Sequence, residues 1–154
     1  MSLGMADSDD DGFENCLDAL ETFAEEGMGT GVKTTKRLPK HTLLGEYKGT
    51  HMNYLEAFEY MRNNSMHYIV KADKDDLYIN GEGKEGNILK YINNRCIKSN
   101  CELVNLTRKK VGIITKRVIL PSEPLNYDYN LSYFDGVGRE TIKCNCHPDC
   151  PNFL

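Results

Sequence analysis

Three cysteines stand close together near the end of the chain, in the pattern Cys144-x-Cys146-x-x-x-Cys150. Six cysteines in 154 residues are too few for a disulfide scaffold, so these thiols favour a metal. Zinc fits best, because structural zinc takes four tetrahedral ligands and thiolate sulfur is among its preferred donors. The alternative is three unrelated cysteines, and His147 leaves open whether an imidazole takes part.

Two further segments carry polar groups that could bind or react. They are Gly86-Asn87-Ile88-Leu89-Lys90-Tyr91-Ile92-Asn93-Asn94-Arg95-Cys96 and Asn126-Tyr127-Asp128-Tyr129-Asn130. Taken alone, Asn93 is a turn asparagine, and the tyrosines end a strand, since aromatic pairs pack more often than they react. A function for these residues can therefore be inferred only from the other motifs that occur with them in the chain.

A glycine-rich run, Gly27-Met28-Gly29-Thr30-Gly31, invites interpretation as a phosphate-binding loop. A dinucleotide-binding loop follows a strand and opens a helix, whereas here a predicted helix precedes the glycines. The remaining readings are a helix stop with a tight turn, or a backbone that approaches a ligand closely because Cβ atoms are missing.

Together these segments resemble the signature of SET-domain protein lysine methyltransferases. The first resembles the family's GN-x-x-R-F-I-N-H-S-C segment, the second its [YF]-D-Y segment, and the last its cysteine-rich post-SET tail. Their order and separation also fit the family. Pro121-Ser122-Glu123-Pro124-Leu125 resembles the turn before its catalytic strand.

The resemblance implies a role for each site residue. It makes Tyr129 the catalytic tyrosine of a lysine channel, Tyr127 a switch for the number of methyl groups, and Tyr47 a second active-site tyrosine. S-adenosylmethionine would contact Gly29, Thr30, Gly31, Tyr47, Asn93, Asn94 and Tyr129. Zinc would be held by Cys96, Cys144, Cys146 and Cys150, with Cys101 a buried spare.

Three departures from the family affect the predicted cofactor and zinc ligands. Asn94 and Arg95 stand where the family has histidine and serine, and three residues rather than four separate Cys146 from Cys150. A contact made by the backbone at Asn94 would survive the change. A tighter turn between Cys146 and Cys150 would still allow both thiolates to bind the same zinc.

The elements that must position these residues are mostly short strands. Phe13, Cys16, Leu17, Leu20, Phe23 and Ala24 fall at helical spacing and predict an amphipathic helix over 13–26, stopped by Gly27. Asn53 and Glu56 form a capping box that predicts a second helix. Strands are predicted at Thr42–Tyr47, Met66–Lys71, Leu77–Asn80, Glu102–Leu106 and Val111–Thr115. The fold class is therefore mainly β with a few short helices, and the resemblance implies a SET-domain β-clip with a pseudoknot.

Composition bounds the organisation to one domain, since 154 residues with 40% hydrophobic content bury a single core. We expect a disordered acidic leader at 1–12, the helix at 13–26, a SET domain at 27–135 and a post-SET zinc tail at 136–154. No apolar run or signal pattern indicates a membrane span or secretion, so a soluble, intracellular monomer is expected.

Charge points to a basic partner. The net charge of −4 argues against nucleic-acid binding, and the segment 50–86, a substrate-side insert, has seven acids and four bases, or −3. Such a surface suits a basic peptide. The resemblance therefore implies S-adenosylmethionine-dependent methylation of a protein lysine, most readily on a histone tail in the nucleus. Methylation of non-histone proteins and a catalytically weak zinc-stapled interaction module remain alternatives.

Tyr129→Phe is expected to lower turnover strongly and to leave cofactor affinity nearly intact, because the hydroxyl is assigned to the reacting amine. Asn93→Ala should do the opposite and weaken cofactor affinity first. Steady-state kinetics with calorimetry would measure both effects, and an unchanged rate for Tyr129→Phe would refute its assignment.

Overall fold

The computed structural model of the chain describes residues 16–63, 68–72 and 76–128. Within these ranges the chain has one α-helix, α1 (Tyr54–Asn63), and two short 3₁₀ turns, η2 (Leu17–Ala19) and η3 (Ile88–Tyr91). The strands are β1 (Leu20–Glu25), β2 (Gly29–Thr34), β3 (Leu43–Glu46), β4 (Thr50–Met52), β5 (Ile69–Lys71), β6 (Tyr78–Asn80), β7 (Asn93–Asn94), β8 (Cys101–Thr107), β9 (Lys110–Thr115) and β10 (Asn126–Tyr127). The predicted mainly β class is confirmed for the described residues.

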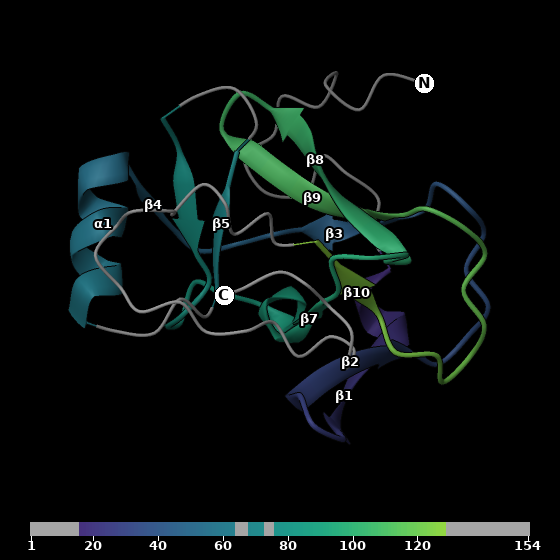
Figure 1. The fold of residues 1–154 in the computed structure, drawn as a ribbon. Coiled ribbons are helices and arrows are strands. Elements are labelled where there is room, and N and C mark those ends of the chain that lie inside the picture. The colour runs from purple at the N-terminus through teal and green to yellow at the C-terminus, as the bar shows by residue number, and fades with distance from the viewer. Residues whose placement is uncertain (1–15, 64–67, 73–75, 129–154) are drawn as a thin grey trace.

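The strands form four small sheets (Figure 1). Strands β3, β9 and β8 make one antiparallel sheet, β4, β6 and β5 make another, and β1 pairs with β2 as a hairpin. Strands β7 and β10 pair in parallel, although more than thirty residues separate them. In Figure 1, helix α1 lies at one side beside β4, and the β1–β2 hairpin lies at the lower end near β7 and β10.

The prediction of a helix over 13–26 is wrong for residues 16–26, the part of it that the structure describes. After the η2 turn the chain extends into β1, whose six residues are all in register with β2, from Leu20 opposite Thr34 to Glu25 opposite Gly29. Gly27 and Gly29 have φ of 76° and 81°, which lets the chain reverse between the strands. Pairing with β2 therefore overrides the helical spacing of the apolar residues.

The second predicted helix is confirmed, and it begins where its capping box indicates. The Asn53 backbone N–H donates to Glu56 Oε1 at 2.9 Å, and the Glu56 N–H donates to Asn53 Oδ1 at 2.8 Å. This reciprocal pair satisfies two donors that would otherwise lack a partner at the helix start. Helix α1 then packs Ala57 and Met61 against Ile69 and Tyr78 in a small second core. No helix among the described residues has the length and apolarity to cross a membrane.

The five predicted strands are confirmed as β3, β5, β6, β8 and β9, with β5–β6 and β8–β9 pairing as antiparallel neighbours. The described part of the Met66–Lys71 strand is Ile69–Lys71. Five strands were not among these five, although β10 coincides with the strand end expected at Tyr127, and two of them, β7 and β10, contain the motif residues. A strand of two residues is too short for an alternating pattern to show.

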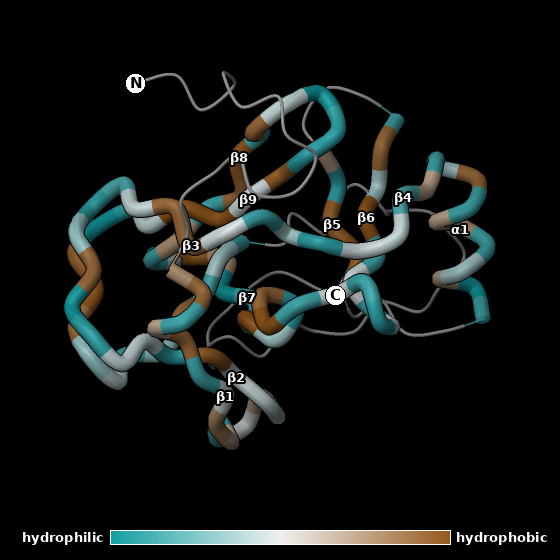
Figure 2. Tube along the Cα trace, turned by 180° about the vertical axis from the view of Figure 1, so that it is seen from behind, coloured by the Kyte–Doolittle hydropathy of each residue, from teal (hydrophilic) through white to brown (hydrophobic). Residues whose placement is uncertain are grey.

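The main core lies where the small sheets meet. Its members include Val32, Leu44, Ile113, Ile119 and Leu125, one from each of several separate segments. In Figure 2 hydrophobic stretches run along β5, β6, β8 and β9 and beside β7, whereas the outer loops are mostly hydrophilic. Tyr127 of β10 and Ile92, next to β7, are members of this core, so the core fixes the position of the β7–β10 pair.

Asn100 is a buried polar residue, with 1% of its surface exposed. Its backbone N–H donates to Asn126 Oδ1, and its own Oδ1 accepts from the Asn126 N–H, both at 2.9 Å. Its Nδ2 donates to the Pro124 carbonyl at 2.8 Å. The start of β8 therefore holds β10 by side-chain hydrogen bonds that imitate strand pairing.

Asn100→Ala is expected to lower the free energy of unfolding by roughly 2 to 4 kcal/mol, because the half-buried Asn126 N–H and Pro124 carbonyl would lose their partners. Urea denaturation would measure the loss. Glu102→Ala, at an exposed position of the same strand, is the control, and its change should stay within about 0.5 kcal/mol. Equal effects of the two variants would contradict the role of Asn100.

Candidate functional site

The two motif segments lie side by side. In the β7–β10 pair Asn126 is opposite Asn93 and Tyr127 is opposite Asn94. The Arg95 backbone N–H extends the pairing by donating to the Tyr127 carbonyl at 3.0 Å. Residues that the sequence marked separately are thus brought to one place in the fold.

Asn93 also reaches the glycine-rich hairpin. Its Nδ2 donates to the Thr30 carbonyl at 3.0 Å and to Glu25 Oε1 at 2.9 Å. Asn93 is half-buried, and Thr30 is exposed at the start of β2. The predicted cofactor residues of β2 and β7 are therefore neighbours, joined by one side-chain amide.

The two glycines of Gly29-Thr30-Gly31 meet different surroundings. A Cβ on Gly29 would have no neighbour within 4 Å, so the space beside it is open, and its φ of 81° favours glycine. A Cβ on Gly31 would collide with Glu25 Oε1 and would lie 3.1 Å from a Phe23 ring carbon. The close approach at Gly31 is thus made by β1 within the protein, and only Gly29 faces open space.

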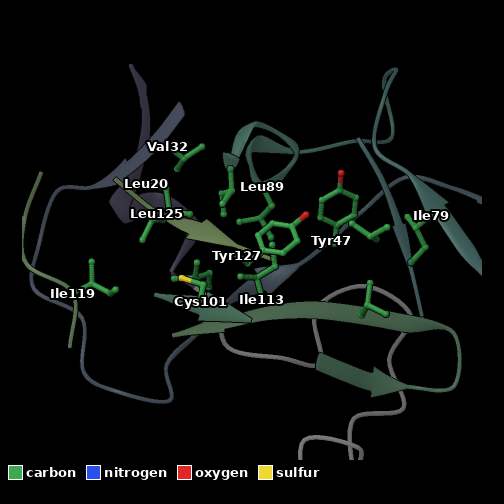
Figure 3. Packing of buried hydrophobic residues seen from close by; sticks show 14 of the residues in the cluster. Leu20, Val32, Tyr47, Ile79, Leu89, Cys101, Ile113, Ile119, Leu125 and Tyr127 are labelled. Atoms are coloured by element: carbon green, nitrogen blue, oxygen red, sulfur yellow. The ribbon is translucent and has the colours of Figure 1, made fainter. Parts of the chain in front are cut away.

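Asn94 and Tyr127 are buried at the centre of the site, with 8% and 2% of their surfaces exposed. Tyr127 belongs to the main core cluster together with Tyr47. Figure 3 shows both tyrosine rings above β9, with their hydroxyl groups directed away from that strand. Two of the three predicted catalytic tyrosines therefore share one apolar environment.

The hydroxyl of Tyr47 donates to the Tyr68 carbonyl at 2.7 Å. The same carbonyl accepts from the Gly81 N–H at 2.7 Å, and Tyr68 has a φ of 75°, which is unusual for a bulky residue. The ring of Tyr68 contacts Tyr91 edge to face at a centroid distance of 5.8 Å. Tyr47 thus links the core to the segment 68–91.

Lys90 lies beside these rings, with its Nζ 5.7 Å from the Tyr68 centroid and 5.3 Å from that of Tyr91. It stands where the quoted family motif has arginine. Tyr68 and this contact could not be predicted from the sequence, since nothing local marks a residue 22 positions from Lys90. The aromatic faces stabilise the ammonium by cation–π attraction.

The glycine and asparagine that open the motif have structural roles. Asn87 caps η3 by accepting from the Leu89 N–H at 3.2 Å, and its Nδ2 donates to the Glu46 carbonyl at 2.9 Å. A Cβ on Gly86 would collide with the Gly81 carbonyl. These contacts fix the entry to η3, and η3 leads directly into Asn93.

The described cysteines differ in their surroundings. Cys101 is buried as predicted, and desolvation raises the pKa of its thiol to about 12. Cys96, two residues beyond β7, is half-buried. No group of three potential ligands occurs among residues 16–63, 68–72 and 76–128. Tyr129, Cys144, Cys146, Cys150 and the whole segment 136–154 lie outside the described residues, as do the leader 1–12 and His147.

The mainly β architecture and the meeting of these motifs define a class of protein. The model of the SET domain family matches residues 29–130, and the chain belongs to that family. It is 32% identical over 143 residues to histone-lysine N-methyltransferase SETD2 of Mus musculus and of Homo sapiens, which covers 88% of this chain and 5% of each relative.

Other relatives carry similar names. The chain is 32% identical over 139 residues to histone-lysine N-methyltransferase ash1 of Drosophila melanogaster, covering 85% of this chain and 6% of that protein. It is 25% identical over 142 residues to the H3 lysine-36 specific histone-lysine N-methyltransferase of Saccharomyces cerevisiae, covering 88% and 19%. The chain thus spans only a small part of the length of these curated relatives.

Tyr47→Phe is expected to lower the free energy of unfolding by about 1 kcal/mol, because it removes the hydrogen bond to Tyr68 while the carbonyl keeps its Gly81 donor. Chemical denaturation would measure it. Tyr54→Phe, which keeps its ring contacts with Phe58 and Tyr78, is the matched control. A loss no larger than in the control would show that the Tyr47 hydroxyl adds nothing to stability.

Proposed function

We propose that this chain transfers a methyl group from S-adenosylmethionine to a lysine side chain of a histone tail. The observation that carries the proposal is the meeting of Thr30, Asn93 and Tyr127 from three distant segments. Membership of the SET family and the printed names of the relatives support the reaction class.

The described residues fit the cofactor. Gly29 borders open space, and Asn93 Oδ1 accepts no hydrogen bond from the described residues, so a polar ligand would have both room and an acceptor. We assign the cofactor contacts to Gly29, Thr30, Gly31, Tyr47, Asn93, Asn94 and Tyr129. When bound, S-adenosylmethionine would supply a methyl group on a positively charged sulfur.

The protein must present the substrate lysine as a neutral amine. Removing the proton of a lysine with the ordinary pKa of 10.4 at pH 7 costs about 4.6 kcal/mol. Buried aromatic walls such as those of Tyr47 and Tyr127 lower that cost by disfavouring the charged form. The hydroxyl of Tyr129 is assigned to orient the amine, so positioning supplies much of the catalysis.

The insert 50–86 is the proposed substrate surface. Its net charge is −3, and in the described structure it includes the sheet ordered β4-β6-β5, whose outer strands β4 and β5 are edges. An extended basic peptide would add to such an edge and meet the acidic surface. Because several relatives are named as H3 lysine-36 specific, we propose histone H3, and first its lysine 36, as the substrate, in nuclear chromatin.

Mass spectrometry on nucleosomes and free histones incubated with the full chain and S-adenosylmethionine tests this function. Methylated H3 lysine 36 is the expected product. A peptide array would reveal activity restricted to other proteins, and calorimetry that shows no cofactor binding would favour a zinc-stapled interaction module, motivated by Asn94 and Arg95. Absence of methylation on every substrate would reject the proposal.

We also propose that Cys96, Cys144, Cys146 and Cys150 hold one structural zinc. Four cysteines suit tetrahedral zinc, and Cys96 follows β7 so closely that a metal there would tie the tail to the cofactor site. Cys101 is a poor candidate because its side chain is fully buried in the main hydrophobic core. The segment 136–154 would then be a post-SET tail.

Chelation of zinc is expected to abolish activity while the β core stays folded, since the metal would organise the tail rather than the sheets. Metal analysis should give one zinc per chain, and circular dichroism should change little. Active protein without zinc would contradict the assignment.

Tyr127→Phe is expected to shift the product toward the next methylation state. The buried hydroxyl would hold a water or the amine, and a bulkier methylated amine must displace that group at a cost of about 1 kcal/mol or more. The wild type should therefore stop at mono- or dimethyl-lysine, as read by mass spectrometry. Tyr54→Phe is the control, and trimethyl-lysine as the main wild-type product would overturn the assignment.

A further inference from the structure

We propose that Glu25 is a positioning residue that fixes the side-chain amide of Asn93 and so directs an acceptor to the amino-acid end of the cofactor. This inference rests on the proposed function, because it assumes that S-adenosylmethionine binds beside β7. Glu25 belongs to β1, outside the motifs, and 68 residues separate it from Asn93. The contact exists only in the folded chain.

The chemistry of the contact sets the orientation of the amide. Asn93 Nδ2 lies 2.9 Å from Glu25 Oε1 and 3.0 Å from the Thr30 carbonyl oxygen. A carboxylate and a carbonyl can only accept hydrogen bonds, so the amide must turn its two N–H groups toward them. The bond to the carboxylate is charge-assisted and stronger than the bond to the carbonyl.

This orientation determines where the amide oxygen points. Because the amide is planar, Oδ1 lies opposite the two N–H groups and faces away from Glu25 and Thr30. No described residue donates to that oxygen. It is therefore available to accept from a ligand, and the ammonium group of the cofactor's amino-acid end is a donor of the right kind.

The glycines of the facing strand β2 leave room for the carboxylate of Glu25. Glu25 is opposite Gly29 in the hairpin and half-buried, and its Oε1 occupies the place that a Cβ on Gly31 would take. Any other residue at 31 would push the carboxylate away from Asn93. The glycine thus serves the Glu25–Asn93 contact, which gives it a function besides approach to a ligand.

The charge of Glu25 adds to this effect. Among the described residues no lysine or arginine forms an ion pair with it, whereas Glu21 on the same strand lies 3.7 Å from Lys33. An unpaired carboxylate beside the cofactor site attracts a cation by Coulomb interaction. A hydrogen-bonding role and a charge role can be separated by substitution.

The test compares two ligands that differ only at the amino-acid end. S-adenosylhomocysteine has the ammonium and carboxylate groups, and 5′-methylthioadenosine lacks both while keeping the adenosine and a neutral thioether. Calorimetry would give both dissociation constants for the wild type, Glu25→Ala, Glu25→Gln and the control Glu26→Gln. Glu26 is the exposed neighbour of Glu25, so the control removes a nearby charge without the contact.

Glu25→Ala is expected to weaken S-adenosylhomocysteine by about ten-fold and 5′-methylthioadenosine by less than about two-fold. Glu25→Gln still has an oxygen that accepts from Asn93, so it should fall between Glu25→Ala and the wild type. Glu26→Gln should bind both ligands as the wild type does. In an Asn93→Ala background Glu25→Ala should have a clearly smaller effect than in the wild type, because the part that acts through the Asn93 contact is already lost and only the effect of the charge remains.

Three results would overturn the inference. Unchanged S-adenosylhomocysteine affinity in Glu25→Ala is the first, and equal weakening of both ligands, which indicates only a damaged hairpin, is the second. The third is full additivity of the Glu25 and Asn93 substitutions. A wild type that binds neither ligand would instead reject the proposed function itself, so the two failures are distinguishable.

Discussion

The site depends on a parallel strand pair that is too short to hold itself together. Strands β7 and β10 contribute two residues each, and so few hydrogen bonds cannot offset the entropy of ordering two distant segments. The pair is stable because other contacts also hold β10 in place. Asn100 forms hydrogen bonds with Asn126 and Pro124. The Leu125 N–H donates to the Val32 carbonyl at 2.8 Å. The segment of β10 is thus held by Asn100, next to β8, and by Val32 of β2 as well as by β7.

The loop that delivers β10 is fixed in the same way. Leu38 and Ile119 exchange backbone hydrogen bonds at 2.9 Å, and both side chains are buried. Arg117 forms an ion pair with Glu123, and this hydrogen bond lowers the pKa of the Glu123 carboxyl. Since the folded pKa lies below the unfolded one, the stabilising contribution is present above the unfolded pKa and is lost as the pH falls through the folded value. The loop is therefore best held near neutral pH.

The elements that could be predicted from the sequence are those whose determining residues lie close together along the chain. The capping box of α1 was visible because its two partners lie three residues apart, and five strands were visible because their apolar residues and polar turns adjoin. The segment of β1 was misread, since the spacing of its apolar residues is also helical and its actual partner, β2, follows only after the turn at Gly27. Glu25 and Asn100 were missed because their hydrogen-bond partners lie 68 and 26 residues away. The resemblance marked Asn93 and Tyr127, but only the fold shows that they adjoin.

Close backbone approaches explain how the insert packs against the rest of the domain. A Cβ on Gly49 would collide with the Asn80 carbonyl, and a Cβ on Gly81 would lie 2.9 Å from the Tyr47 hydroxyl and 3.1 Å from the Lys90 Cβ. The β4-β6-β5 sheet can therefore sit against the core only where side chains are absent. Tyr47 also connects the insert to the main core. Its hydroxyl donates to the Tyr68 carbonyl, and its ring belongs to the same core cluster as Tyr127. A peptide bound to an edge of the insert would thus be held on a surface that Tyr47 connects directly to the predicted lysine channel.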